Sequence, residues 1–215
     1  MADFSIENCL QKQGFYNIAG VDEAGRGPLA GPVVAAAVIL DCCTDIFKDV
    51  NDSKKITKSK RKELFELIIK NAISYSIQFV NENIIDNINI LQSTIQAMNS
   101  AIKGLNTKVD FIIVDGNYFH YSMGIKDIPF KTIIKGDVKS ISIAAASILA
   151  KVARDEWMEE VAAKEFPQYN FMKNKGYPTK EHINLLKKYG ACKYHRKSFI
   201  KKFNVNNVLF KESLF

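Results

Sequence analysis

Short apolar segments alternate along the chain with longer segments in which apolar residues recur at helical spacing. Three nearly continuous apolar runs, at residues 18–21, 33–40 and 111–114, predict buried strands, and residues 130–134 predict another strand. Residues 73–79 alternate between apolar and polar, which predicts a strand with one solvent-facing side. Helical spacing predicts helices over residues 57–71, 84–102, 141–165 and 179–189. The pattern therefore predicts an α/β protein with five strands and a helical C-terminal third.

Acidic residues directly follow two of these predicted strands. Asp22 and Glu23 come after the first strand, and Asp115 comes after the fourth. A long helix separates the third predicted strand from the fourth, and a connection of that length permits a parallel crossover. In open α/β sheets, ligands gather at the carboxyl ends of parallel strands. If the first and fourth strands are parallel neighbours, the three acids meet at one edge of the sheet.

Asp22, Glu23, Asp115 and Asp137 are the candidate metal ligands. Adjacent carboxylates repel each other, so a fold that buries them side by side normally needs a cation. Carboxylates without a partnering His or Cys suit hard divalent cations such as Mg²⁺ or Mn²⁺. Two such ions could activate a water and stabilise a leaving oxygen at phosphorus. Taken singly, each acid also fits a loop or cap position, and the Asp115 segment fits a turn. The combination favours the metal site.

A glycine loop, formed by Gly25, Arg26, Gly27 and Pro28, follows the first acidic pair. Glycines let backbone N–H groups approach another molecule closely, as phosphate binding requires. The loop is not a Walker A motif, because Arg26-Gly27 replaces the required Lys-Ser/Thr. Its glycine spacing is also one residue too long for a dinucleotide fingerprint. The alternative is a tight strand-to-strand connection, which would not require Arg26.

Two further segments are candidates for substrate contact. Asp52, Ser53 and Lys54 form either an ordinary polar loop or a source of hydroxyl and ammonium donors to a phosphate backbone. Tyr177 is either a packed aromatic at the start of a helix or a residue that stacks on a sugar or base. Its position beside a glycine in a basic region is compatible with the second interpretation.

The positive charge is concentrated near the C-terminus. The net charge is +7, and 10 of the 30 Lys and Arg residues lie between residues 173 and 202, where Glu181 is the only acid. Such a region is typical of a nucleic-acid-binding surface. The N-terminus lacks the features of a signal peptide, and no apolar run is long enough to span a bilayer. We therefore expect a cytoplasmic protein without a membrane partner.

The cysteines and histidines give no metal-binding pattern. Cys9, Cys42, Cys43 and Cys192 form no C-x-x-C pair and no ligand spacing with His120, His182 or His195. We expect reduced thiols and no zinc site. The scattered histidines favour surface or core positions over a catalytic base.

Several motifs follow one another along the chain. The first is GVDEAGRGP at residues 20–28. The others are NDSKK at 51–55, VDGN at 114–117, KGD at 135–137, SIAAASILAKVARD at 142–155, KGYPTKEH at 175–182 and, more loosely, HRKSF at 195–199. In this order they resemble the ribonuclease HII family, the type 2 ribonucleases H of bacteria. The resemblance covers nearly the whole chain except the first residues and the tail after Phe203.

The resemblance implies an RNase H-like fold, with a five-stranded mixed sheet, flanking helices and a helical C-terminal region. It implies one catalytic domain over residues 1–215, with a lead-in at 1–12 and a substrate-binding part from about 167 to 215. The implied activity is endonucleolytic hydrolysis of the RNA strand of RNA–DNA hybrids and of duplex DNA at single embedded ribonucleotides. The implied products carry 3′-hydroxyl and 5′-phosphate ends, and the implied cofactor is Mn²⁺ or Mg²⁺.

The resemblance also implies roles for individual residues. Asp22, Glu23, Asp115 and Asp137 match the catalytic, metal-binding acids. The substrate-binding positions are Gly25, Arg26, Gly27, Asp52, Ser53, Lys54, Lys151 and Tyr177. Of these, the glycine loop and Tyr177 would recognise the junction between a ribonucleotide and the following deoxyribonucleotide, where the 2′-hydroxyl separates RNA from DNA.

We expect a monomer without an obligate protein partner, acting on RNA–DNA hybrids and ribonucleotide-containing duplexes. Two alternatives are an RNase H-fold DNA nuclease or recombinase that ignores the 2′-hydroxyl, and a basic hybrid-binding protein without catalysis.

Overall fold

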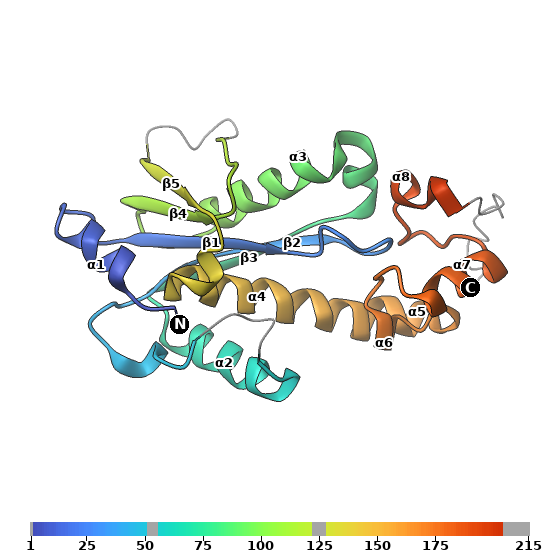
Figure 1. The fold of residues 1–215 in the computed structure, drawn as a ribbon, viewed down its shortest axis with the longest axis horizontal. Coiled ribbons are helices and arrows are strands. Elements are labelled where there is room, and N and C mark those ends of the chain that lie inside the picture. The colour runs from blue at the N-terminus through green and yellow to red at the C-terminus, as the bar shows by residue number, and fades with distance from the viewer. Residues whose placement is uncertain (1, 51–55, 122–127, 204–215) are drawn as a thin grey trace.

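A mixed five-stranded sheet forms the middle of the protein, and helices cover both of its faces (Figure 1). The computed structural model describes residues 2–50, 56–121 and 128–203. The strand order is β3-β2-β1-β4-β5, in which β1 runs antiparallel to β2 and parallel to β4. β3 is antiparallel to β2, and β5 is parallel to β4. The strands are β1 Ile18–Ala24, β2 Val33–Ile39, β3 Ser74–Val80, β4 Phe111–Asp115 and β5 Phe130–Ile133.

Helix α3 lies on one face of the sheet, and α4 and α2 lie on the other (Figure 1). The C-terminal helices gather beyond the end of the sheet where β1 turns into β2 (Figure 1). The α-helices are α1 Ser5–Gln11, α2 Lys58–Asn71, α3 Glu82–Lys103, α4 Ile141–Trp157, α5 Ala163–Glu165, α6 Phe171–Asn174, α7 Lys180–Tyr189 and α8 Lys197–Ile200. Shorter 3-10 turns are η1 Asp45–Phe47, η2 Gly136–Val138, η4 Pro167–Tyr169 and η5 Lys201–Phe203, and η3 Met158–Ala162 is a π-helix. The predicted fold class is confirmed.

The core is divided between the two helical layers by the alternation of side chains along β2. Val34, Ala36 and Val38 pack in one cluster with the alanine-rich face of α4 and with α2. The odd-numbered residues from 33 to 39 pack in a second cluster with α3. All of β2 is buried, as expected of a strand covered on both faces. None of the helices within the described ranges is long and apolar enough to cross a membrane.

Strand β1 is longer than its apolar run predicts. We expected the strand to end before Asp22, but it continues through Asp22 and Glu23 to Ala24. The reason is the antiparallel neighbour, because Asp22 and Glu23 pair with Ala36 and Ala35 of β2. The parallel pairing of β1 with β4 ends at Val21, as predicted for the carboxyl end of that pair. Asp22 and Glu23 are therefore paired with β2 on one side of β1 and not with β4 on the other.

The predicted long helix over residues 141–165 is helical throughout but not regular. The α-helical hydrogen bonding ends at Trp157, a π-helix follows over Met158–Ala162, and α5 completes the segment. At this change, Met158 packs so closely on Gly31 that a Cβ there would lie 2.3 Å from its sulfur. The other predicted helices lie where expected, including the Thr57 N-cap of α2 and the Gly104 C-cap of α3, although α3 is kinked at Asn89, whose φ is +66°.

The sequence pattern missed the short helices at both ends of the chain. Helix α1 lies within the predicted lead-in, and its Glu7 is fully buried. Glu7 accepts hydrogen bonds from the Ser140 hydroxyl (2.6 Å) and the Ser142 N–H (3.0 Å) at the start of α4. A carboxylate there favours the helix N-terminus. The lead-in thus fixes the end of the helix that runs under the acidic residues.

Candidate active site

Asp22 and Asp115 face the same side of the sheet. Val21 and Val114 are register partners on β1 and β4, and both belong to the core beneath α3. Because side chains alternate along a strand, the next residues, Asp22 and Asp115, point toward α4. Ser147 of α4 contacts Asp22 through its hydroxyl. The strand geometry thus brings together two acids that are far apart in the sequence, as predicted.

The acids interact unfavourably with one another. Asp22 is only 4% exposed, and burial raises the pKa of its carboxyl well above the usual range. The negative charges of Glu23 and Asp115 raise that pKa further, while hydrogen bonds from Ser147 and from the Glu23 N–H (2.7 Å) oppose the rise. Burial also raises the pKa of Glu23, and Arg26, whose Nη1 lies 3.3 Å from Glu23 Oε1, partly offsets the rise.

Asp137 is brought to Asp115 by the tight turn η2. The Gly136 N–H donates to Asp115 Oδ1 at 2.6 Å, and Asp137 is the next residue, itself buried. A Cβ on Gly136 would lie 2.6 Å from Ile143 of α4 and 3.3 Å from Asp115 Oδ1. Glycine therefore lets the turn approach both elements. The turn therefore holds the backbone next to Asp137 against the Asp115 carboxylate.

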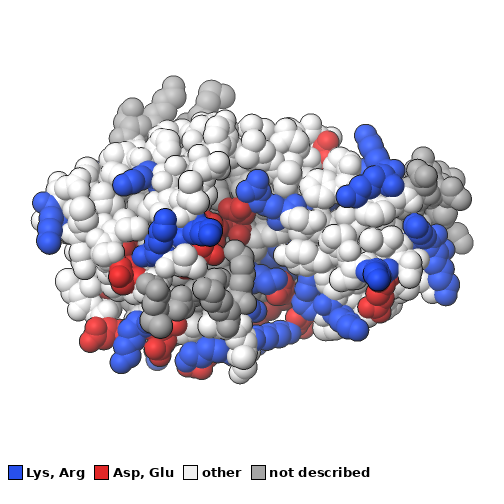
Figure 2. Space-filling view, in the orientation of Figure 1, with Lys and Arg blue, Asp and Glu red and all other residues white. Residues whose placement is uncertain are grey.

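The acidic residues fit a divalent cation by their chemistry. Their side-chain donors are all carboxylate oxygens, which suit hard cations, and a cation would relieve the repulsion and burial that raise the pKa of Asp22. Over the described ranges, no three or more Asp, Glu, His or Cys side chains are already arranged closely enough to hold a metal ion. In the face of the molecule shown in Figure 2, acidic atoms near the middle lie directly beside basic ones, and further clusters of basic atoms lie toward the C-terminal helices.

The two glycines of the loop after β1 serve different purposes. Gly25 is buried with φ +96°, and a Cβ there would lie 2.2 Å from Nε of Arg154. Gly27 is exposed, and a Cβ there would meet nothing within 4 Å. Gly25 is thus required by the fold, whereas Gly27 leaves the outside of the loop open. Between them, the Arg26 side chain is 53% exposed.

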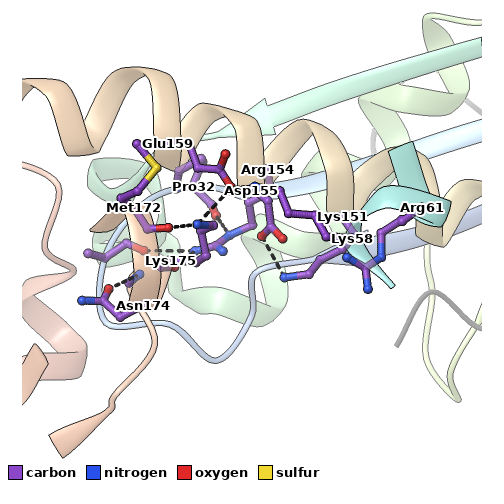
Figure 3. A network of polar contacts seen from close by, with 12 residues as sticks. Pro32, Lys58, Arg61, Lys151, Arg154, Asp155, Glu159, Met172, Asn174 and Lys175 are labelled. Atoms are coloured by element: carbon purple, nitrogen blue, oxygen red, sulfur yellow. Dashed lines mark hydrogen bonds and ion pairs between the residues drawn. The ribbon is translucent and has the colours of Figure 1, made fainter. Parts of the chain in front are cut away.

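Arg154 of α4 ties this loop to the segment before Tyr177. Its guanidinium is fully buried, with Nε donating to the Pro32 carbonyl (3.0 Å) and Nη2 to the carbonyls of Ala30 and Lys175 (both 3.1 Å). Figure 3 shows Arg154 reaching from α4 toward Pro32 and Lys175. Two segments about 145 residues apart in the chain, from Ala30 to Lys175, are therefore held side by side by one side chain.

Tyr177 and Lys151 lie against the same arginine. The Tyr177 ring centre is 5.6 Å from the Arg154 guanidinium carbon and 5.5 Å from Lys151 Nζ, and 38% of Tyr177 is exposed. Lys151 Nζ also bonds Asp155 at 2.8 Å. The structure thus places Tyr177, Lys151 and the glycine loop together. The predicted contacts of Asp52, Ser53 and Lys54 lie outside the described residues.

Sequence reasoning missed three supporting residues, Ser147, Arg154 and Arg196. All three fall inside the motif segments 142–155 and 195–199, but nothing in their spacing indicated a role. The two arginines are fully buried and bond mainly backbone carbonyls. A buried guanidinium of this kind has no pattern in the sequence, because its acceptors are peptide groups.

The comparisons with known proteins agree with this arrangement. A family model described as Ribonuclease HII matches residues 19–202. The chain belongs to the ribonuclease HII family. Ribonuclease HII of Caldicellulosiruptor bescii is 52% identical over 198 residues, covering 92% of this chain and 93% of that protein. Ribonuclease HII of Caldanaerobacter subterraneus subsp. tengcongensis is 54% identical over 199 residues, covering 91% and 79%.

A solved structure supports the same family at the level of the fold. The crystal structure of ribonuclease H2 from Pyrococcus horikoshii OT3 matches with a TM-score of 0.72 and 28% identity, covering 87% of this chain and 96% of that one. The ribonuclease HII family cleaves the RNA of RNA–DNA hybrids and ribonucleotides within DNA. The resemblance of the motifs, the RNase H-like fold and the assignment as an endonucleolytic ribonuclease H are therefore confirmed.

Proposed function

We propose that Asp22, Glu23, Asp115 and Asp137 are the catalytic, metal-binding acids of this member of the ribonuclease HII family. The observation that carries the proposal is the buried Asp22 carboxyl, whose pKa is raised by burial and by the charges of Glu23 and Asp115. Such a group of acids is electrostatically costly without a cation. A non-catalytic hybrid-binding protein would gain nothing from it, since the acids would repel a polyanion.

The carboxylates would hold Mg²⁺ or Mn²⁺, and the family depends on divalent metal. A divalent cation bound at such a site activates water and stabilises the leaving oxygen of a phosphodiester. The chain's own residues set the position of the acids. Ser147 holds the Asp22 carboxyl from α4, and the Gly136 N–H holds Asp115 Oδ1. Cleavage by water would leave 3′-hydroxyl and 5′-phosphate ends.

Substrate recognition is assigned to the loop of Gly25, Arg26 and Gly27 together with Tyr177. Two properties support this role. Arg26 is half exposed at the end of the strand that carries the acids, and it contacts Glu23. The exposed Tyr177 ring lies on Lys151 and Arg154, beside the same loop. This combination suits a phosphate held by backbone amides and a sugar or base stacked on an aromatic ring.

The acids are tested by single substitutions to amides. Asp22→Asn and Asp115→Asn should abolish cleavage of a duplex that contains one ribonucleotide, with an unchanged circular dichroism spectrum. The matched control is Asp45→Asn, an exposed Asp in η1, which should cleave like the wild type. Full activity in both active-site variants would overturn the assignment.

The recognition residues are tested by two measurements, the preference for a single ribonucleotide and the affinity for the duplex. Arg26→Ala and Tyr177→Ala should lose the preference for a single ribonucleotide more than they lose affinity for the duplex. Equal losses of the ribonucleotide preference and of the duplex affinity would mean that these side chains only support the fold or contact phosphates. An all-DNA duplex measured in parallel distinguishes this function from that of an RNase H-fold DNA nuclease, which would cut both.

A further inference from the structure

Two family motif segments contain residues that the proposed function does not use. They are His182, at the end of the segment 175–182, and His195-Arg196, at the start of the segment 195–199. The sequence predicts only scattered surface or core histidines. The structure instead joins all three residues in one buried group, with exposures of 0% for His182, 2% for His195 and 0% for Arg196.

Arg196 holds the glycine loop by its backbone. Its Nη2 donates to the carbonyls of Gly25 (2.6 Å) and Gly31 (2.8 Å), its Nη1 to that of Arg26 (3.1 Å), and its Nε to that of Gly31 (2.9 Å). The planar fork of the guanidinium fits several carbonyls at once, which a lysine ammonium on a flexible stem does not. Burial, together with the charge of Arg154, lowers the pKa of Arg196 to about 9, so it stays charged at neutral pH.

The two histidines form a chain of hydrogen bonds that ends on Tyr177. His182 Nδ1 lies 2.9 Å from the Tyr177 carbonyl, and a carbonyl can only accept, so Nδ1 carries the proton. His182 Nε2 then accepts from His195 Nε2–H at 3.1 Å, and His195 Nδ1 accepts from the Cys192 N–H at 3.0 Å. All ring nitrogens are satisfied only while both rings are neutral.

Backbone pairing places residues 29–31, which follow the glycine loop, between Gly176 and the His195-Arg196 dipeptide. Residues 29–31 pair with the segment around His195, through bonds from the Arg196 N–H to Leu29 O and from the Gly31 N–H to Tyr194 O, both 2.8 Å. On their other side, the Leu29 N–H donates to the carbonyl of Gly176 at 2.8 Å. A short stretch of backbone is therefore shared between the glycine loop, Tyr177 and the C-terminal segment.

We propose that His195-Arg196 is a positioning element that fixes the distance between the glycine loop and Tyr177, and thereby sets the preference for a ribonucleotide–deoxyribonucleotide junction. Arg196 sets the loop and His195 sets Tyr177 through His182. A junction is recognised only when both elements meet the same two nucleotides. A continuous RNA–DNA hybrid offers a 2′-hydroxyl at every position of its RNA strand. Its cleavage is therefore less sensitive to displacement of the glycine loop or Tyr177. This inference rests on the proposed roles of Arg26 and Tyr177.

The test is the ratio of kcat/KM on a duplex with one ribonucleotide to kcat/KM on a continuous hybrid. Both values come from one preparation, so any loss of folded enzyme cancels in the ratio. The variants are Arg196→Lys, which keeps the charge but not the fork, and His195→Gln, which removes the imidazole. Misplacement of a substrate-positioning group by about 1 Å can cost about 100-fold, and we expect the ratio to fall by about 10- to 100-fold in each variant.

The controls distinguish a failure of this inference from a failure of the recognition role proposed for Arg26 and Tyr177. Lys108→Met, an exposed lysine before β4 and far from Asp115 along the strand, should keep the wild-type ratio. If Arg26→Ala and Tyr177→Ala lower the ratio but Arg196→Lys and His195→Gln do not, the positioning role is wrong and the recognition role stands. If Arg26→Ala and Tyr177→Ala leave the ratio unchanged, the proposed recognition role itself fails.

A double variant gives a second readout that a merely structural role would not produce. His195→Gln combined with Tyr177→Ala should lower the ratio little more than Tyr177→Ala alone, because His195 acts through Tyr177 and coupled residues are not additive. Independent, multiplicative losses would overturn the coupling.

Discussion

Replacing His195 with glutamine should make the protein less sensitive to acid. The pKa of His195 is lowered from 6.5 to about 3, mainly by burial and in smaller part by the neighbouring His182. At pH values between 6.5 and about 3, the unfolded chain binds a proton at His195 that the folded protein does not bind. Stability therefore falls as the pH drops below about 6.5, and it falls until about pH 3.

The size of the effect follows from that interval. At about pH 5 the unfolded state gains about 2 kcal/mol from protonating His195, while the folded state gains almost nothing. Carboxylates also titrate in this range, and the raised pKa of Asp22 acts in the opposite direction. They are present in both proteins, so they cancel in the difference between wild type and His195→Gln.

The assay is urea denaturation of both proteins at about pH 8 and about pH 5. The free energy of unfolding of the wild type should drop by about 2 kcal/mol more than that of His195→Gln over this range. A difference between the two proteins that stays constant with pH would refute the reasoning, because it would mean that His195 is not kept neutral by the fold.

Three more predictions concern the loop, the sheet and the metal. Gly20→Ala should destabilise the fold by about 1–3 kcal/mol in urea denaturation, because its Cβ would lie 2.3 Å from the backbone of α4; wild-type stability would contradict the close packing. Gly25→Ala should lower the melting temperature while Gly27→Ala should not, because only Gly25 has a crowded Cβ position, and equal changes would disagree with the structure. Asp22→Asn should raise the free energy of unfolding without metal and abolish the stabilisation that Mg²⁺ gives the wild type. If Mg²⁺ stabilised the Asp22→Asn variant as much as the wild type, the result would argue against the site.

The acidic group could be predicted because it follows from local rules. Apolar runs located β1 and β4, and the crossover rule placed their carboxyl ends together. The exact end of β1 could not be predicted, since Asp22 and Glu23 remain in the strand only through pairing with small alanines of β2. That partner lies on another segment, and a local pattern carries no information about it.

The supporting group around Arg196 could not be predicted at all. His182 and His195 are 13 residues apart, with no spacing typical of a contact, and they meet because the backbone turns after α7. Arg154 lies in an alanine-rich helix where a basic residue normally faces solvent, yet loop carbonyls bury it. Such contacts depend on tertiary structure, whereas the motifs indicated only which segments matter.

The central claim is tested most directly by cleavage of a duplex that contains one ribonucleotide, with and without added Mg²⁺ or Mn²⁺, beside an all-DNA duplex of the same sequence. The account predicts a cut at the ribonucleotide only when a divalent metal is present, with 3′-hydroxyl and 5′-phosphate ends, and an intact all-DNA duplex. Cleavage without divalent metal, or equal cleavage of the two duplexes, would contradict it.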